Sequence, residues 1–349
     1  MKRFKYLIPG CVIAMSALAS CSGAEKTEAP DEIYFTDNIK VYPADAFVVD
    51  TLAGGIVIDE VVGGTWLAVG NGVIAVATPR DETMVKLYTT GGDSIGAFCT
   101  KGQGPNDFYN ADLMRPYLSE SGDTCIWIND VSMTKFKRLN LSKSFREGMT
   151  LVDSVVNTEF GAINAFMAGD MLLYEVMDND AYKLCSRSIA DESDTLRSEQ
   201  MYVYPTADFY AYYGNSDVSS DGRHIAVGMA YFNQLNMIDL PDMKRTAVSI
   251  GNLGKYEDCY DSANRESKFY AYGDVSCGND EVYAIYYGRS ADESDEETKG
   301  TTIHVIGYDG KVKRVLAVPE ILRSISYDDS TSTLYGIDSE ERVYKYDIK

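Results

Sequence analysis

The chain has 349 residues, with 53 acidic and 32 basic side chains and a formal net charge of −21 at pH 7. Nucleic-acid backbones and anionic membrane surfaces both require a basic face, so neither is expected to bind the folded part of this chain. Hydrophobic residues make up 45 %, enough for one large closed β fold or two ordinary domains.

Residues 1–20 are expected to form a lipoprotein signal peptide. Three basic residues among the first five precede an apolar run, 6–19, which is short for a membrane span. The run ends in Leu18-Ala19-Ser20-Cys21, which resembles a bacterial lipobox. We therefore expect Cys21 to carry the lipid, with palmitate as the label that would reveal it. An ordinary secretory signal with an incidental cysteine is the alternative, and cleavage before Cys11 would leave a very short apolar segment.

Residues 21–34 are small, polar and charged, which is typical of a flexible tether. Position 22 is serine, not the aspartate that retains lipoproteins at the inner membrane. The sequence thus predicts an outer-membrane lipoprotein, facing the periplasm or displayed on the surface. We expect residues 35–349 to form a single folded domain.

Six short apolar runs recur along this domain, beginning at positions 73, 124, 171, 224, 281 and 333. Each follows a turn rich in glycine, asparagine or aspartate, such as Asn71-Gly72 or Asp221-Gly222. More alternating runs follow, such as 303–308, and most repeats add a fourth, such as 246–250. A period near fifty residues with several strands per repeat is typical of a propeller blade.

The sixth repeat stops at Lys349 after its third strand, so its outer strand must come from elsewhere. The strand-like segment 46–58 precedes the first repeat and is expected to fill this place. The sequence therefore predicts an all-β, six-bladed β-propeller of four-stranded blades, closed by an N-terminal strand that completes the last blade. Two β-sandwiches would show no such period, and an open β-helix a shorter one. No helix-length amphipathic segment with convincing caps is expected after Asp31.

One glycine-rich stretch, Lys101 to Phe108, follows the fourth strand of the first repeat. It resembles the GxGPx(D/E)F signature of TolB-like six-bladed propeller lipoproteins of Gram-negative bacteria, many of which have no known function. The residues that carry the resemblance are Gly102, Gly104, Pro105, Asp107 and Phe108. The resemblance implies the fold and a structural role for the motif, with a tight excursion between blades and Phe108 filling the gap.

Propeller loops separate onto two faces, and the segments that join blades share one face with the loops between second and third strands. Aromatic residues gather in these segments here, and Phe-Tyr-Ala-Tyr occurs twice, 60 residues apart. An acidic loop is expected on the same face. The candidate ligand-binding residues are Phe108, Tyr109, Phe209, Tyr210, Tyr212, Phe269, Tyr270, Tyr272, Asp292, Glu293 and Asp295. This set suits a sugar, a peptide or a basic protein segment. The alternative is that the aromatics only wedge between blades and the acidic loop is solvated.

Catalytic and metal motifs are absent from the sequence: it contains no HExxH, GxSxG, P-loop or DxDxDG pattern. Its two histidines, His224 and His304, fall in strands of different repeats and are expected to be packed or at the rim. The five cysteines after Cys21 have no metal-ligand spacing and are expected to be small buried hydrophobes. We therefore expect no metal, no cofactor and no catalytic residue.

Three functions remain open. The first is a non-enzymatic, lipid-anchored module that binds an unknown protein, peptide or glycan through one loop face. The second is a metal-assisted propeller enzyme, lactonase-like or lyase-like, with its site in the central channel. The third is a structural subunit of a surface complex. The channel discriminates between the first two, and its first-strand candidates, Asp217, Ser219, Asp274 and Ser276, are polar but include no histidine.

Overall fold

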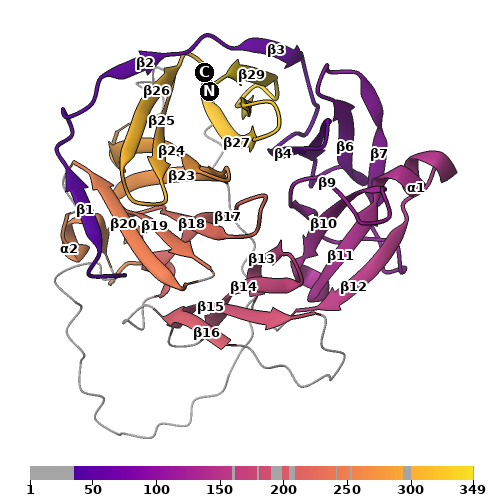
Figure 1. The fold of residues 1–349 in the computed structure, drawn as a ribbon, viewed down its shortest axis with the longest axis horizontal. Helices are drawn as coiled ribbons and strands as arrows, with labels where there is room; N and C mark the ends of the chain where they lie inside the picture. The colour runs from indigo at the N-terminus through magenta and orange to yellow at the C-terminus, as the bar shows by residue number, and fades with distance from the viewer. Residues whose placement is uncertain are drawn as a thin grey trace, which may run out of the picture.

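A computed structural model describes residues 35–158, 162–178, 181–189, 199–203, 209–240, 242–251, 254–261, 263–293 and 300–348. Six small antiparallel sheets stand around a central axis, and the chain passes round the ring once (Figure 1). The fold is a six-bladed β-propeller, as predicted. Within the described ranges, no helix has both the length and the apolar character needed to cross a membrane.

Each blade is built from strands that follow one another along the chain, innermost first. Blade 1 contains β4 (Trp66–Gly70), β5 (Val73–Ala77), β6 (Thr83–Thr89) and β7 (Ser94–Thr100). Blade 2 contains β8 (Asp112–Leu113), β9 (Tyr117–Leu118), β10 (Thr124–Asp130), β11 (Lys135–Asn140) and β12 (Val152–Asn157). Its inner strand is split, since β8 and β9 both pair with β10.

The remaining blades complete the ring. Blade 3 contains β13 (Ala162–Ala168), β14 (Met171–Asp178), β15 (Ala181–Ser188) and β16 (Glu199–Val203). Blade 4 contains β17 (Gly214–Val218), β18 (His224–Met229), β19 (Leu235–Asp239) and β20 (Lys244–Ile250). Blade 5 contains β23 (Phe269–Cys277), β24 (Glu281–Ser290), β25 (Thr301–Gly307) and β26 (Val312–Val318). Blade 6 contains β27 (Leu322–Asp328), β28 (Thr333–Asp338) and β29 (Val343–Asp347). A two-stranded ribbon, β21 (Tyr260–Asp261) and β22 (Glu266–Ser267), lies between blades 4 and 5 in sequence.

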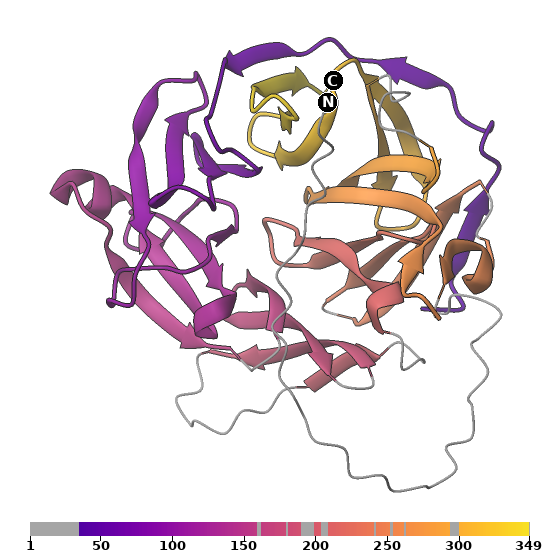
Figure 2. The same ribbon diagram turned by 180° about the vertical axis from the view of Figure 1, so that it is seen from behind.

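All six apolar runs found in the sequence are second strands, and each pairs with a strand on both sides. The ring closes as predicted, because β3 (Gly55–Ile58) pairs antiparallel with β29 as the outer strand of blade 6. Strand β1 (Ile39–Tyr42), which adds in parallel to β20, was not predicted. Only the end of the predicted closing segment 46–58 pairs with blade 6, because β2 (Val49–Thr51) adds in parallel to β26 of blade 5 instead. The N-terminal segment thus runs along the outer rim of blades 4, 5 and 6 (Figures 1 and 2).

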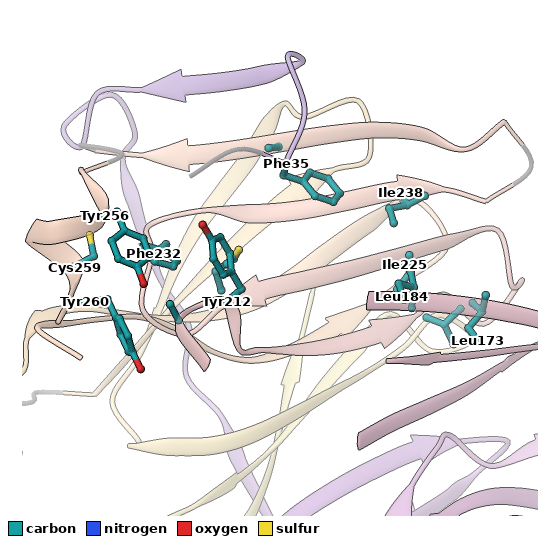
Figure 3. Packing of buried hydrophobic residues seen from close by; sticks show 14 of the residues in the cluster. Phe35, Leu173, Leu184, Tyr212, Ile225, Phe232, Ile238, Tyr256, Cys259 and Tyr260 are labelled. Atoms are coloured by element: carbon teal, nitrogen blue, oxygen red, sulfur yellow. The ribbon is translucent and has the colours of Figure 1, made fainter. Parts of the chain in front are cut away.

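The hydrophobic core of the described chain consists of six clusters, each joining a pair of neighbouring blades. Figure 3 shows the cluster between blades 3 and 4, where Leu173 and Leu184 meet Ile225 and Ile238. Flat sheets that are apolar on both faces can bury those faces only against each other. This is why the second strands are nearly continuous in apolar residues.

The sequence predicted no helix-length amphipathic segment after Asp31, but one short capped helix is present. Helix α1 (Leu141–Glu147) joins the third and fourth strands of blade 2. The Asn140 side chain caps its start by accepting from the Lys143 amide at 2.9 Å, and Gly148 ends it in the left-handed region. Three further single turns occur, η1 (Val131–Met133), η2 (Phe209–Tyr212) and α2 (Tyr256–Cys259).

The glycine-rich motif has a structural role in the connection from blade 1 to blade 2. The Asp107 carboxylate folds back to accept the Gly104 amide at 2.8 Å, and a Cβ on Gly102 would lie 2.3 Å from that carboxylate. Phe108 is fully buried, with the Lys137 ammonium 4.4 Å from its ring centre. Lys137 also forms a buried ion pair with Asp130 at 2.9 Å.

Candidate functional site

The face of the ring that carries the blade-to-blade connections is hollowed over blades 3, 4 and 5. We call this side the connection face and the hollow the tyrosine hollow. Its volume is about 540 Å³, and it is lined by Tyr210, Tyr213, Tyr231, Tyr260, Arg265, Ile163 and Asn164. Rings that remain partly solvated in a concave site are suited to packing against a ligand.

The Phe-Tyr-Ala-Tyr string before β17 positions two of these rings. It forms the single turn η2, which buries Ala211 and Tyr212 and leaves Tyr210 and Tyr213 about 40 % exposed. Tyr212 anchors the turn by packing on Phe232 and Tyr256, with ring centres 5.6 and 6.4 Å away. The buried aromatic residue therefore holds the exposed ones in place.

The second Phe-Tyr-Ala-Tyr string has the same burial pattern, although it begins strand β23. Tyr270 is 37 % exposed, whereas Ala271 and Tyr272 are buried. The Tyr270 ring lies 6.3 Å from Tyr231, so it extends the tyrosine hollow toward blade 5. Arg265 also lines the tyrosine hollow, and its guanidinium lies 5.2 Å from the ring centre of Tyr210.

The structure separates the predicted ligand-binding residues into two groups. Tyr109, Tyr210 and Tyr270 are exposed on the connection face, and Asp292 and Glu293 are exposed in the loop that follows β24. Phe108, Tyr212 and Tyr272 lie in the core instead and cannot contact a ligand, because packing between blades buries them, and Phe269 is only partly exposed. The Phe209 side chain, Asp295 and Cys21 lie outside what the structure describes.

A second cavity, of about 480 Å³, occupies the ring axis on the connection-face side. We call it the axial chamber. Inner strands of several blades contribute its polar groups, which include Asp112 of β8, Asn164 of β13, Ser216 of β17, Asp274 of β23 and Ser324 of β27. Carboxylates thus converge on the axis, but neither histidine does. His224 stacks on Tyr308, and buried His304 stacks on Tyr286, where burial lowers its pKa to about 4.

Two carboxylates of the axial chamber titrate far from the ordinary range. Burial raises the pKa of Asp112 to about 7, with Asp274 and Glu175 adding repulsion and a hydrogen bond from Asn129 opposing the shift. Burial also raises the pKa of Asp274 to about 6, although Ser324 and the Ile325 amide donate to it. In the described part of the chain, no Lys, Arg or His forms an ion pair with either carboxylate, and no three acidic, His or Cys groups are placed to hold a metal ion.

An ion pair crosses the axis at the inner end of this chamber. Arg115 leaves blade 2 between β8 and β9 and donates to Asp217 of blade 4 and to the Ser276 hydroxyl of blade 5, the latter at 3.1 Å. The Asp217 carboxylate also accepts the Cys277 amide at 2.8 Å. Asp217 and Ser276 were among the channel candidates in the sequence, and both do line the axis.

A third cavity, of about 540 Å³, opens on the opposite face and shares Arg115 and Asp217 with the axial chamber. Its walls are more apolar and include Trp127, Tyr117 and Met167, with Ser219 at the edge. The Arg115–Asp217 pair therefore separates two cavities along one axis. On the connection face, the axial chamber and the tyrosine hollow are adjacent, with Asn164 and Tyr213 in the walls of both, and we call the two together the composite site.

Sequence patterns did not single out Asp112 or Arg115. The inner strand of blade 2 consists of two two-residue pieces, so it shows no alternating run. The sequence did offer one positional signal. The first strand of each blade lies at the axis of a propeller, so polar residues in the segment before each second strand are candidates for lining the channel.

The fold and its axial cavities define the class: this protein is a six-bladed β-propeller. No family model matches the chain, and no curated protein matches it. Among solved structures, it is similar to a member of the DUF4221 family from Bacteroides vulgatus, with 12 % identity and a TM-score of 0.54. That match covers 87 % of this chain and 95 % of the other.

A second similar structure is a protein from Bacteroides fragilis NCTC 9343 whose name describes it as a candidate exported protein. It shows 11 % identity and a TM-score of 0.54, covering 88 % of this chain and 98 % of the other. At this level of identity, both likenesses establish the fold alone.

Proposed function

We propose that this protein is a lipid-anchored propeller of the bacterial cell envelope that binds a ligand, without catalysis, through its connection face. The observation that carries the proposal is the composite site, in which a tyrosine-lined hollow lies beside a polar axial chamber. Cavities of several hundred cubic ångströms with aromatic walls and a few convergent polar groups are the usual form of a ligand site.

The anchor rests on the sequence. Leu18-Ala19-Ser20-Cys21 has the form of a lipobox, and Ser22 is compatible with transfer to the outer membrane. The likeness of the glycine-rich motif to TolB-like propeller lipoproteins, and the name of the Bacteroides fragilis neighbour, support an envelope location. Growth with radioactive palmitate should label the wild-type protein and not Cys21→Ala. Equal labelling of the two would disprove the anchor.

Ligand binding is tested by screening the full chain, in detergent, against oligosaccharides and peptides by saturation-transfer NMR. Hits should bind wild type and lose affinity about thirtyfold in the double variant Tyr210→Ala/Tyr270→Ala, because each of the two rings contributes about 1 kcal/mol of contact. Phe145→Ala/Met149→Ala is the matched control, since both side chains are exposed around α1, away from the tyrosine hollow. A double tyrosine variant that loses stability but no ligand would show that the tyrosines only pack between blades.

An enzymatic role is the second candidate, and the pKa of Asp112 favours it. A carboxyl group that titrates near 7 in a cavity is suited to general acid–base catalysis. The measurement is turnover of a screened lactone or uronate substrate by wild type and its loss in Asp112→Asn. Binding without turnover in wild type would leave only the first proposal.

A further inference from the structure

We infer that the axial chamber binds the cationic side chain of a peptide, a lysine or arginine, whose backbone lies in the tyrosine hollow. This rests on the proposed function and names the class of ligand for the same composite site. Three observations support it: the charge of the chamber, an unsatisfied polar atom in its wall, and the adjacency of the two cavities.

The charge of the chamber is unbalanced. Asp217 is paired with Arg115, whereas Asp112 and Asp274 have no cationic partner among the described residues. Both carboxylates accept hydrogen bonds from neutral groups: Asn129 donates to Asp112, and Ser324 and the amides of Val275 and Ile325 donate to Asp274. Two partly buried carboxylates facing one cavity repel each other, and an ammonium or guanidinium group between them would remove that cost.

The chamber also contains a donor that a simple cation would not satisfy. Trp66 lines the chamber, and its indole nitrogen is buried without a hydrogen-bond partner in the described structure. An unmet buried donor calls for an acceptor on the ligand. An amino-acid residue supplies both requirements, because its side chain is cationic and its amide carbonyl accepts.

The adjacency of the two cavities lets one ligand occupy both. Asn164 and Tyr213 belong to both, so a chain lying over the tyrosines can send a side chain toward the axis. Arg265 already places a guanidinium over Tyr210, which shows that these rings accept a cation. At the other end of the chamber, the Arg115–Asp217 pair lies between it and the cavity of the opposite face, so we expect the ligand to enter from the connection face.

The test uses two probes of nearly the same size and shape, N-acetyl-arginine amide, which is cationic, and its neutral urea analogue N-acetyl-citrulline amide. Isothermal titration of the full chain at pH 8 should show the arginine probe binding about tenfold more tightly. Asp274→Asn and Asp112→Asn should each weaken the arginine probe about fivefold or more and leave the citrulline probe within twofold. The control Asp292→Asn changes an exposed carboxylate on the same face and should alter neither probe more than twofold.

The pH dependence of wild type gives a second measurement that needs no variant. The charged and titratable groups around the chamber are Asp112, Asp217, Asp274, Glu175, Arg115, Arg323 and Tyr213. Protonation of the two unpaired carboxylates should weaken the arginine probe about tenfold between pH 8 and pH 5.

Several outcomes would overturn the inference: equal affinity for the two probes, no binding of the arginine probe, or arginine affinity that is unchanged by both Asp→Asn variants and by pH. If the two probes bind equally and only Tyr210→Ala/Tyr270→Ala weakens them, the connection face is a binding site but the chamber does not select a cation. That result would retain the proposed function and reject this inference.

Discussion

Arg115 reaches across the axis of the ring from blade 2 and pairs with Asp217 of blade 4. The two side chains are 14 % and 21 % exposed, and the pair divides the axial space into two cavities that open on opposite faces. A single ion pair thus ties two non-adjacent blades and sets the depth of the candidate site.

Replacing Arg115 by methionine should lower the free energy of unfolding by about 3 kcal/mol, because it leaves the Asp217 carboxylate largely buried without a cation. The double variant Arg115→Met/Asp217→Asn should recover most of that loss. Urea unfolding followed by circular dichroism measures both. The control Lys311→Met removes an exposed pair with Asp309 and should cost less than about 1 kcal/mol. If Arg115→Met and Lys311→Met lower the free energy of unfolding equally, the axial pair has no special structural role.

Gly102→Ala should destabilise the protein by about 1–3 kcal/mol, because the added Cβ would lie 2.3 Å from the Asp107 carboxylate and expel it from its turn. Gly55→Ala is the matched control, since nothing lies within 4 Å of its added Cβ, and it should be neutral or slightly stabilising. When Gly102→Ala is already present, the further change Asp107→Ala should lower the stability of the protein only slightly more. The midpoint of thermal unfolding reports all three, and a tolerant Gly102 would refute the motif's packing role.

The closing strand β3 contains both a buried and an exposed isoleucine, so it allows a test of how much ring closure contributes to stability. Ile58 is buried against blade 1 and blade 6, whereas Ile56 is 51 % exposed. Ile58→Ala should cost about 2–4 kcal/mol by creating a cavity at the closure, and Ile56→Ala less than about 1 kcal/mol. Denaturant titration gives both numbers. Similar small losses would mean that the ring does not depend on its closure for stability.

Stability should depend on pH through Asp112. Its pKa is about 7 in the folded protein, against an ordinary value of 3.8 for a solvated aspartate, so the folded state binds the proton more tightly than the unfolded chain does. Stability from this group is therefore present below pH 4 and is lost as the pH rises toward 7. Asp112→Asn should thus gain on the order of 2–4 kcal/mol relative to wild type at pH 8 and little at pH 4.

Unfolding of wild type and Asp112→Asn in urea at the two pH values measures this difference. Asp292→Asn serves as control because its carboxylate is exposed. A difference between wild type and Asp112→Asn that is the same at both pH values would show that Asp112 is not perturbed.

The blades were predictable because each second strand is covered on both faces, which demands a nearly continuous apolar run at a regular period. Val73–Ala77 and Glu281–Ser290 are examples, and both contain the runs expected for them. Closure was predictable because a repeat lacking its last strand leaves an unpaired edge. Strand β1 was missed and β2 was assigned to the last blade instead of blade 5, since short strands on an outer edge have little apolar pattern.

The aromatic strings show where local pattern stops being informative. Phe-Tyr-Ala-Tyr occurs twice, and its composition indicated aromatic crowding on one face, but not which rings would be solvated. Packing against Phe232 and Tyr256 buries Tyr212, and contact with His304 and Tyr286 buries Tyr272, while Tyr210 and Tyr270 remain exposed.

Periodicity along the chain was therefore sufficient for the number of blades, their strand order and the joining of the two ends, because these follow from burying apolar faces and pairing edges. The axial chamber required the folded ring. Asp112, Arg115, Asp217 and Asp274 are separated by up to 162 residues, and their meeting depends on how far each inner strand stands from the axis. Charged residues that look ordinary in the sequence form a site only when several blades bring them into one cavity.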